Sequence, residues 1–320
     1  MNMGLLHDQS TQPTVARIKI AVVGAGAMGG YFAGRLAERG IPVTLIDVDE
    51  ERVSAIASKG LRIEDDHGDR RIPIAASTAR QLSEPFDLII IFTKSMHTAS
   101  AAESVRHLVS NSTWFLTLQN GLGNPEIIQS IYPGNRVVMG ITDVPADVID
   151  HAHVRSHAKG TVSIWTLDGR PSDSIEQVRV LIEGAGIATK ADPNIRTAIW
   201  EKVSFNAAMN PVTALTNKPV GGLENPTGRA LIRAIVDEAV ATARAAGVAV
   251  DRDRIFERID NALAHHKEHK PSMLQDMRAG RQTEIDALNG AIVSIGEAHG
   301  VPVPVNRTIV DLIRTAQMRP

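Results

Sequence analysis

The sequence predicts an α/β fold in which an N-terminal domain with a parallel sheet is followed by an all-α C-terminal domain. Up to residue 190, short β-branched apolar runs alternate with amphipathic segments, as βαβ units require. Beyond residue 194, every long segment instead shows the periodicity of a helix. We therefore predict two domains, residues 17–192 and residues 193–320.

The bulk composition excludes several classes of function. The 320 residues are 43% hydrophobic, which is enough to build a sizeable core. The formal net charge of -2 gives no electrostatic basis for binding nucleic acid or a membrane surface. Because the chain has no cysteine, disulfides and thiolate metal sites are excluded, and we expect a cytoplasmic protein. Residues 1–16 are polar and are expected to form a disordered leader rather than a signal peptide.

A glycine-rich turn follows the first predicted strand, residues 18–23. It has the pattern G-x-G-x-x-G and leads into a helix predicted over residues 31–39. Gly24 serves the tight turn, Gly26 lets the backbone approach a pyrophosphate, and Gly29 allows the helix to pack closely on the strand. Free N–H groups at the helix N-terminus favour phosphate. The turn therefore predicts a Rossmann-type dinucleotide site rather than a purely structural turn. The residues expected to hold the cofactor here are Gly24, Gly26, Ala27, Met28 and Gly29.

The second predicted strand, residues 43–46, ends in Asp47. This carboxylate lies 18 positions after Gly29, where it can accept both hydrogen bonds of an adenosine ribose diol. A 2'-phosphate would meet the negative charge of Asp47 and of acidic residues 49–51. We therefore predict NAD, with NADP as the alternative. Two other interpretations stay open, since Arg52 could pair with a phosphate and Asp47 could simply cap the next helix.

The rest of the first domain continues the βαβ pattern and then changes to an antiparallel edge. In chain order, the predicted elements are helix 49–58, hairpin 61–75, strand 86–92, helix 97–110, strand 114–118, antiparallel edge strands within 136–165, helix 171–184 and strand 187–190. Lys94 and Asn120 come just after two of the buried strands, and ligands of open α/β sheets bind beyond those ends. Both are predicted to face the cofactor, although Lys94 could equally be a solvated strand end.

One face of a helix in the second domain carries an unusual polar row. The predicted helices are residues 195–210, 226–246, 251–267, 272–299 and 305–317. Lys202, Asn206 and Asn210 recur at every fourth position of the first helix and so share a face. Asparagine is a poor helix former, so we expect this face to bind a ligand. The alternative is a solvated face on which Asn210 caps the helix before Pro211.

The fourth predicted helix carries two further candidates. Ser272 and Gln275 fit a capping box at its start, which by itself would explain Ser272. Glu284 shares a face with an apolar stripe and is expected to be buried against a partner or to face a cleft, whereas Asp286 lies off that face and should be solvated. The histidines at positions 265–269 are interleaved with charged residues, so we interpret them as an exposed helix end and predict no metal.

These stretches together resemble the ketopantoate reductase (2-dehydropantoate 2-reductase) family. The resemblance covers nearly the whole chain after residue 17 and rests, in order, on residues 24–29, 93–94, 119–121, 202–211 and 272–284. It implies a Rossmann-type domain, a helical domain, an active site in the cleft between them and a role in pantothenate biosynthesis. The roles that it implies are Lys202 as catalytic acid, Glu284 on the substrate hydroxyl, Asn120 beside the nicotinamide, Lys94 over the cofactor, and Asn206, Asn210 and Ser272 on the 2-oxo acid.

The sequence departs from the family pattern at two places. Family members commonly have an arginine after the second strand that takes the 2'-phosphate of NADP, whereas residues 47–51 here are mostly acidic. Val220 stands where an asparagine that contacts pantoate is usual. The reaction type is unaffected, but we expect ketopantoate to be used poorly or a more apolar 2-oxo acid to be preferred.

The function predicted from these residues is hydride transfer between a nicotinamide cofactor and a 2-oxo acid/2-hydroxy acid pair. Lys202 would donate a proton to the reacting oxygen, and Glu284 would orient both. A 3-hydroxy acid dehydrogenase of the related two-domain class and a non-catalytic dinucleotide sensor are the alternatives. Asn206 and Asn210 disfavour the first alternative, and the presence of both acid–base residues disfavours the second. The expected partner is a small 2-oxo acid rather than nucleic acid or a membrane, with a homodimer left open.

Overall fold

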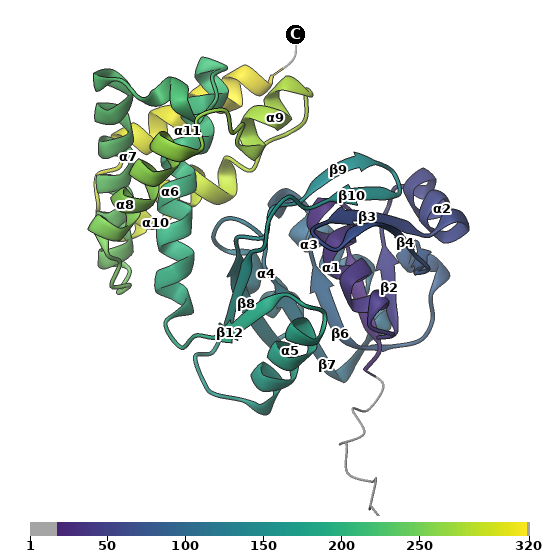
Figure 1. Cartoon of the computed structure of the whole chain (residues 1–320). Helices are drawn as coiled ribbons and strands as arrows, with labels where there is room; N and C mark the ends of the chain where they lie inside the picture. Colours follow the sequence, from purple (N-terminus) through teal and green to yellow (C-terminus); the bar gives the residue numbers. More distant parts are fainter. Residues whose placement is uncertain (1–17, 319–320) are drawn as a thin grey trace, which may run out of the picture.

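The computed structural model describes residues 18–318, so the predicted leader at residues 1–16 lies outside the described residues. Figure 1 shows an α/β domain beside a helical region, and one long helix, α6 (Ile195–Thr216), leads from the first into the second. The predicted fold class is confirmed, because a mainly parallel sheet with flanking helices precedes a region made of helices.

An eight-stranded sheet forms the centre of the α/β domain, with the strand order β12-β11-β8-β7-β6-β1-β2-β5. Its strands are β1 (Ile20–Val23), β2 (Val43–Ile46), β5 (Ala75–Ser77), β6 (Phe86–Ile91), β7 (Val109–Thr117), β8 (Arg136–Thr142), β11 (Thr161–Thr166) and β12 (Ala188–Ala191). Every neighbouring pair is parallel except β11 with β8. The carboxyl ends of β1, β2, β6, β7 and β8 therefore meet along one edge, which is where the predicted cofactor residues lie.

Helices cover both faces of this sheet. They are α1 (Ala27–Glu38), α2 (Glu50–Lys59), α3 (Thr98–Ser104), α4 (Asn124–Ile131) and α5 (Asp173–Gly184). In β1, Ile20 and Val22 pack with α1 and α5, whereas Ala21 and Val23 pack with α3 and α4. Two cores on either side explain why the strand sequences are apolar throughout rather than alternating. The helix α4 was not predicted, and α3 is shorter than expected because a 3-10 turn and the start of β7 occupy residues 106–110.

A second sheet lies against α1, and it corrects the predicted edge of the domain. It has the order β4-β3-β10-β9, formed by β3 (Leu61–Asp65), β4 (Gly68–Ile72), β9 (Asp147–Asp150) and β10 (His153–Arg155). The predicted hairpin is β3 and β4. The strands β9 and β10 do not join the main sheet as predicted, because β10 pairs with β3 and β9 pairs with β10. Two glycines of α1 permit this contact, because a Cβ on Gly34 would lie 2.4 Å from Ile63 and one on Gly30 would lie 2.9 Å from Val154.

The helical region packs around α6. Its other helices are α7 (Pro226–Ala245), α8 (Arg252–His265), α9 (Ser272–Arg278), α10 (Ala291–Ala298) and α11 (Pro304–Gln317). The middle of α6 supplies fully buried Ala207, Ala208 and Met209 to a core shared with these helices. None of the helices within residues 18–318 is both long enough and apolar enough to cross a membrane.

Helix α6 does not end before Pro211 as predicted but continues to Thr216. A proline inside a helix lacks the N–H that would bond to the carbonyl four residues earlier. That carbonyl, on Ala207, accepts a hydrogen bond from Nδ2 of buried Asn289 at 3.0 Å instead. A side chain from a distant segment therefore replaces the backbone hydrogen bond that Pro211 cannot make. Asn210 lies within the helix rather than at a cap.

The single helix predicted over residues 272–299 is also interrupted. Helix α9 ends at Arg278, Gly280 adopts a φ of +63°, and a π-helical turn over Asp286–Gly290 precedes α10. Glu284 therefore lies in an irregular segment that crosses towards the α/β domain. The apolar stripe that follows it is divided between the π-helical turn, which supplies buried Leu288, and α10, which supplies buried Ile292.

Candidate active site

The glycine turn has the geometry that a dinucleotide requires. Gly24 has a φ of +99°, and a Cβ there would lie 2.8 Å from the backbone nitrogen of Thr93. A Cβ on Gly29 would lie 1.8 Å from the carbonyl oxygen of Gly24, whereas the space beside Gly26 is open to at least 4 Å. The turn is thus closed where the backbone packs and open where a pyrophosphate would approach. Helix α1 begins at Ala27, earlier than predicted, so Ala27 and Met28 form its first turn.

Asp47 points back towards this turn. Its Oδ2 accepts a hydrogen bond from the backbone N–H of Ala25 at 2.6 Å, and its Oδ1 accepts one from the N–H of Asp49 at 3.0 Å. The N-cap of α2 is Asp49, which accepts from the N–H of Arg52 at 3.0 Å. The interpretation of Asp47 as a helix cap is therefore wrong, and its carboxylate orients the turn instead.

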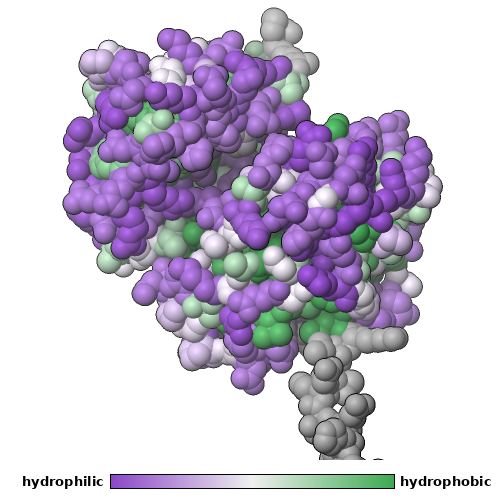
Figure 2. All heavy atoms as spheres, in the orientation of Figure 1, coloured by the Kyte–Doolittle hydropathy of each residue, from purple (hydrophilic) through white to green (hydrophobic). Residues whose placement is uncertain are grey.

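A cavity of about 630 Å³ runs along the carboxyl edge of the sheet. Its walls include Gly24, Gly26, Asp47, Arg52 and Lys94, so it joins the glycine turn to the end of β6. Figure 2 shows that hydrophilic side chains cover most of the drawn face of the helical region and the adjoining upper part of the α/β domain. The cavity has the position expected for a dinucleotide in an open α/β sheet.

The irregular segment of the helical region meets this edge through Glu284. Its Oε1 accepts hydrogen bonds from the backbone N–H of Ser95 at 2.9 Å and from the Ser95 hydroxyl at 2.7 Å. The same hydroxyl lies 2.9 Å from the carbonyl oxygen of Asn120. Ser95 thus connects two of the predicted site residues. Asp286 is exposed and pairs with Arg314, which agrees with its predicted place on the solvent side.

A second contact across the same junction pairs Lys94 with Asp276 of α9. Asp276 is only 4% exposed and also accepts from Nε of Arg281 at 3.0 Å. Nearby, the N–H of Leu122 donates to the carbonyl of Ala287 at 2.9 Å. Lys94 is therefore neither a free solvated strand end nor directed at the cavity alone, because its ammonium bridges the two parts of the chain.

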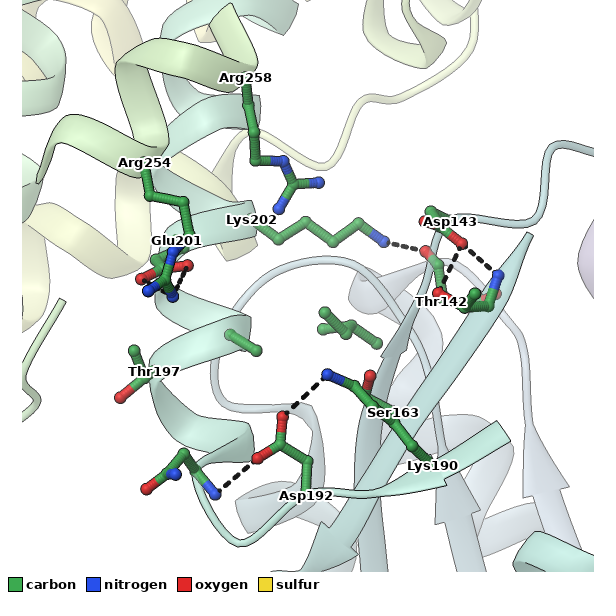
Figure 3. Close-up of a pocket in the computed structure, with 14 residues that line it drawn as sticks. Thr142, Asp143, Ser163, Lys190, Asp192, Thr197, Glu201, Lys202, Arg254 and Arg258 are labelled. Carbon is green, nitrogen blue, oxygen red and sulfur yellow. Dashed lines mark hydrogen bonds and ion pairs between the residues drawn. The ribbon is translucent and has the colours of Figure 1, made fainter. Parts of the chain in front are cut away.

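Lys202 projects from α6 to the end of β8. Its Nζ donates a hydrogen bond to the carbonyl oxygen of Thr142 at 2.6 Å (Figure 3). Burial of the ammonium, followed by the positive charge of Arg258, lowers the pKa of Lys202 to about 8. The carboxylates of Asp143 and Glu284 oppose this shift. A lysine in this range can both hold and release a proton near neutral pH, as a general acid must.

The remaining predicted substrate residues lie on α6 and α9, which form the helical wall of the candidate site, opposite an α/β wall formed by the carboxyl edge of the sheet. Asn206 is half-buried and Asn210 is buried on α6, one and two turns beyond Lys202. Ser272 is exposed at the first position of α9, a helix that packs against α6. The predicted capping box is wrong, because Pro271 occupies the N-cap position and no side chain caps the helix.

Val220 does not lie where its predicted role would need it. Its side chain is 2% exposed within the core of the helical region, and its N–H donates to the carbonyl of His269 at 3.0 Å. The expectation of an apolar substrate consequently gains no support from this residue. Among residues 18–318, no group of three or more His, Asp or Glu side chains is arranged to hold a metal ion.

Sequence reasoning missed the residues that join the two walls, Ser95 and Asp276. Ser95 follows the predicted residue Lys94 in the sequence, and Asp276 lies one helical turn after Ser272 on α9. A buried carboxylate calls for a partner, so the apolar neighbours of Asp276 were a usable signal. No local pattern marks Ser95, because its importance depends on where Glu284 is brought.

Two family models match the chain in sequence order. The first, described as Ketopantoate reductase PanE/ApbA, matches residues 20–169, and the second, described as the C terminal of the same family, matches residues 194–317. A 2-dehydropantoate 2-reductase of Halobacterium salinarum is 32% identical over 303 residues, which are 94% of this chain and 99% of that protein. The chain belongs to the ketopantoate reductase family. A 2-dehydropantoate 2-reductase of Pyrococcus abyssi is 35% identical, and the match covers 93% of this chain and 97% of that protein.

Solved structures of the ketopantoate reductase family have the same fold over nearly the whole chain. A family member from Ralstonia eutropha superposes with a TM-score of 0.87 at 32% identity, covering 94% of this chain and 98% of that one. A D-mandelate dehydrogenase solved with NADH and anilino(oxo)acetate gives a TM-score of 0.89 at 27% identity, with the same coverage of both chains. The predicted resemblance is confirmed, and the chain is a ketopantoate reductase-like oxidoreductase that uses a nicotinamide cofactor.

Proposed function

We propose that this protein reduces a 2-oxo acid to the 2-hydroxy acid with NADH, using Lys202 as the general acid. The observation that carries the proposal is the environment of Lys202, whose pKa is lowered to about 8 where the helical wall meets the carboxyl edge of the sheet. We assign the cofactor to residues 17–192 and most of the substrate contacts to residues 193–320.

The substrate carbonyl would be polarised by Lys202. When bound, the reduced nicotinamide supplies the hydride that adds to the carbonyl carbon. Lys202 then donates a hydrogen bond, and finally a proton, to the oxygen on which negative charge develops. Glu284 is held through Oε1 by Ser95, so that Oε2 can accept from the nascent hydroxyl.

The substrate carboxylate would be recognised by neutral donors. Asn206 and Asn210 present amide groups in line with Lys202, and Ser272 adds a hydroxyl at the start of α9. Asn120, three residues after β7, would lie beside the nicotinamide, and Lys94 would lie over the cofactor. The related D-mandelate dehydrogenase, which was solved with NADH and an oxo-substituted acetate, supports this class of ligand.

NADH rather than NADPH is the proposed reductant. Asp47 lines the cavity, and its carboxylate would accept from the ribose hydroxyls and repel a 2'-phosphate. Two cations line the same part of the cavity, but both have carboxylate partners. Arg52 lies 3.5 Å from Asp49, and Arg80 is paired with Glu50. A 2'-phosphate would have to displace those partners.

A steady-state screen of 2-oxo acids with NADH and NADPH in parallel tests the proposal. We expect oxidation of NADH with at least one 2-oxo acid and a lower kcat/KM with NADPH. Oxidation with 3-oxo acids alone would favour a 3-hydroxy acid dehydrogenase, and no oxidation with any substrate would contradict the proposed chemistry.

The proposal also includes a cytoplasmic role in pantothenate biosynthesis. The 2-dehydropantoate 2-reductases that resemble this chain along its full length support that role. Slow reduction of ketopantoate is enough for this test, so we expect a ketopantoate reductase-deficient bacterium that expresses this chain to grow without added pantoate, even where another 2-oxo acid is the better substrate. Absence of growth with a soluble, NADH-oxidising protein would assign the chain to another 2-oxo acid.

A further inference from the structure

A second cavity, of about 500 Å³, has Lys202 on its wall, and Figure 3 shows the residues that line it. It is enclosed by the first turns of α6, by α8 and by the β8–β11–β12 end of the sheet. At roughly 3.6 residues per turn, Asn206 and Asn210 fall on one side of Lys202 along the helix, and Ala198 and Glu201 fall on the opposite side. Lys202 therefore stands between the proposed carboxylate site and this second cavity.

Most of the charges in this cavity are already matched. Asp192 lies 3.4 Å from Lys190. Asp143 accepts hydrogen bonds from the backbone and side chain of Thr161. Glu201 carries the remaining carboxylate. It is only 3% exposed and pairs with Arg254 at 3.2 Å. Every carboxylate on the wall of the cavity thus has a donor within the described residues.

Arg258 is the exception among the cations that α8 directs into the cavity. One turn earlier, Arg254 is ion-paired, whereas Arg258 has no carboxylate within ion-pair distance among residues 18–318. Its guanidinium carbon lies 5.8 Å from the ring centroid of Phe205, which supports the planar group from α6. In Figure 3 the Arg258 side chain extends from α8 towards Lys202. Of the four cations on the wall of the cavity, Lys190 and Arg254 are ion-paired, and Lys202 and Arg258 have no ion pair with its carboxylates.

We propose that Arg258 binds an anionic group on the side chain of the substrate, so that the preferred substrate is a 2-oxo acid with a second carboxylate. The inference rests on the proposed function, which puts the reacting carbonyl at Lys202 and the first carboxylate at Asn206 and Asn210. The remainder of the substrate then extends into the cavity on the other flank. A guanidinium supported by an aromatic ring presents a planar pair of donors that suits a carboxylate.

An anion at this place also serves the chemistry of Lys202. The positive charge of Arg258 is the second cause of the lowered pKa of Lys202. A carboxylate bound to Arg258 offsets that charge and raises the pKa of Lys202, so the ammonium stays protonated when the carbonyl is in place. Recognition of the second carboxylate and supply of the proton are thereby linked through one pair of cations.

The test compares 2-oxo dicarboxylates of four to six carbons with 2-oxo monocarboxylates of the same length. For the wild type, we expect kcat/KM to favour the best dicarboxylate by at least about tenfold. Arg258→Met should lower kcat/KM for that dicarboxylate by about 10- to 100-fold, mainly through KM, as expected for loss of a charge-assisted hydrogen bond. Its effect on the monocarboxylate should be several-fold smaller. Arg258→Lys keeps the charge without the planar fork and should lie between the two.

Arg233→Met is the matched control. Arg233 and Arg258 are both exposed, and the guanidinium carbon of Arg233 lies 5.5 Å from the ring centroid of Phe256. Arg233, however, is on α7 and not on the wall of the cavity. This variant should leave the discrimination between the two substrate classes unchanged.

Several results would overturn the inference. A wild type that reduces monocarboxylates as well as dicarboxylates would leave the proposed function standing and reject the role of Arg258. An equal loss on both classes in Arg258→Met would assign the arginine to the carboxylate that both share. No activity on any 2-oxo acid would reject the function and this inference with it.

Discussion

The two walls of the proposed active site are held in place in different ways. On the α/β wall, Asp47 is fixed by backbone N–H groups of its own domain, and the N–H of Gly24 donates to Ile46 at 2.8 Å. On the helical wall, Lys202 and Glu284 are fixed by Thr142 and Ser95, which belong to the opposite wall. The glycine turn and Asp47 are therefore positioned within the α/β domain alone, whereas the proposed acid–base residues are positioned only when the two parts meet.

This difference implies that cofactor affinity and turnover can be separated by mutation. Changes on the helical wall should alter turnover and leave the dissociation constant of the cofactor nearly unchanged. Changes at the glycine turn or Asp47 should do the reverse. The predictions below test this division, from the largest expected effect to the smallest.

Lys202→Ala should give the largest loss. Removing the general acid and its charge should lower kcat by about 10² to 10⁴-fold. The affinity for NADH, measured by fluorescence titration, should remain close to that of the wild type, because the lysine belongs to the other wall. Near-normal turnover in this variant would remove Lys202 from the mechanism.

Glu284→Gln should lower kcat by roughly 10- to 100-fold, within the range of a misplaced acid–base group. The amide is isosteric and can still accept from Ser95, so the melting temperature should change little. A solvated glutamate would give a change of less than about 0.5 kcal/mol in stability and none in rate. Measuring thermal unfolding and kcat on one preparation separates these outcomes.

Asp47→Ala should change the choice of cofactor rather than the chemistry. Loss of the carboxylate removes hydrogen bonds to the ribose and repulsion of a 2'-phosphate, so the ratio of kcat/KM for NADH over NADPH should fall by about tenfold. The two cofactors are compared at equal ionic strength. A ratio that stays constant would show that this carboxylate does not read the ribose.

The pH dependence of the wild type should report the charge on Lys202. Since its pKa is about 8, kcat/KM for reduction should decline as the pH rises through that value and the ammonium loses its proton. Arg258→Met removes a like charge and should move this decline to higher pH, while Asp143→Asn removes a favourable charge and should move it lower. With a monocarboxylate substrate, a decline that neither variant moves would assign the limb to another group.

The α/β wall could be predicted in detail from the sequence because its signals are local. Gly24, Gly26 and Gly29 each serve a turn formed by their neighbours, and a strand buried on both faces is marked by its own apolar run. The switch of β9 and β10 into a second sheet was not predictable, since it depends on the fit of Ile63 and Val154 against glycines of α1.

The helical wall was predicted less well because its irregularities are resolved by distant residues. The row of Lys202, Asn206 and Asn210 follows from helical spacing alone. Pro211, however, signals a helix end unless the position of Asn289 is known, and the break after Arg278 carries no strong local signal beyond Gly280. The links made by Ser95 and Asp276 depend entirely on how the two parts meet.

Pro211 has a consequence for anyone who would engineer this protein for stability. Replacing a proline inside a helix by alanine usually stabilises the helix by about 3 kcal/mol. Here the carbonyl that such a change would return to its own helix is the acceptor for Asn289, which is fully buried and lies five residues after Glu284. This hydrogen bond therefore connects the helix that carries Lys202 to the segment that carries Glu284. Pro211→Ala, a type of change that stabilises most helices, would therefore weaken the contact between the two segments that carry the proposed catalytic residues.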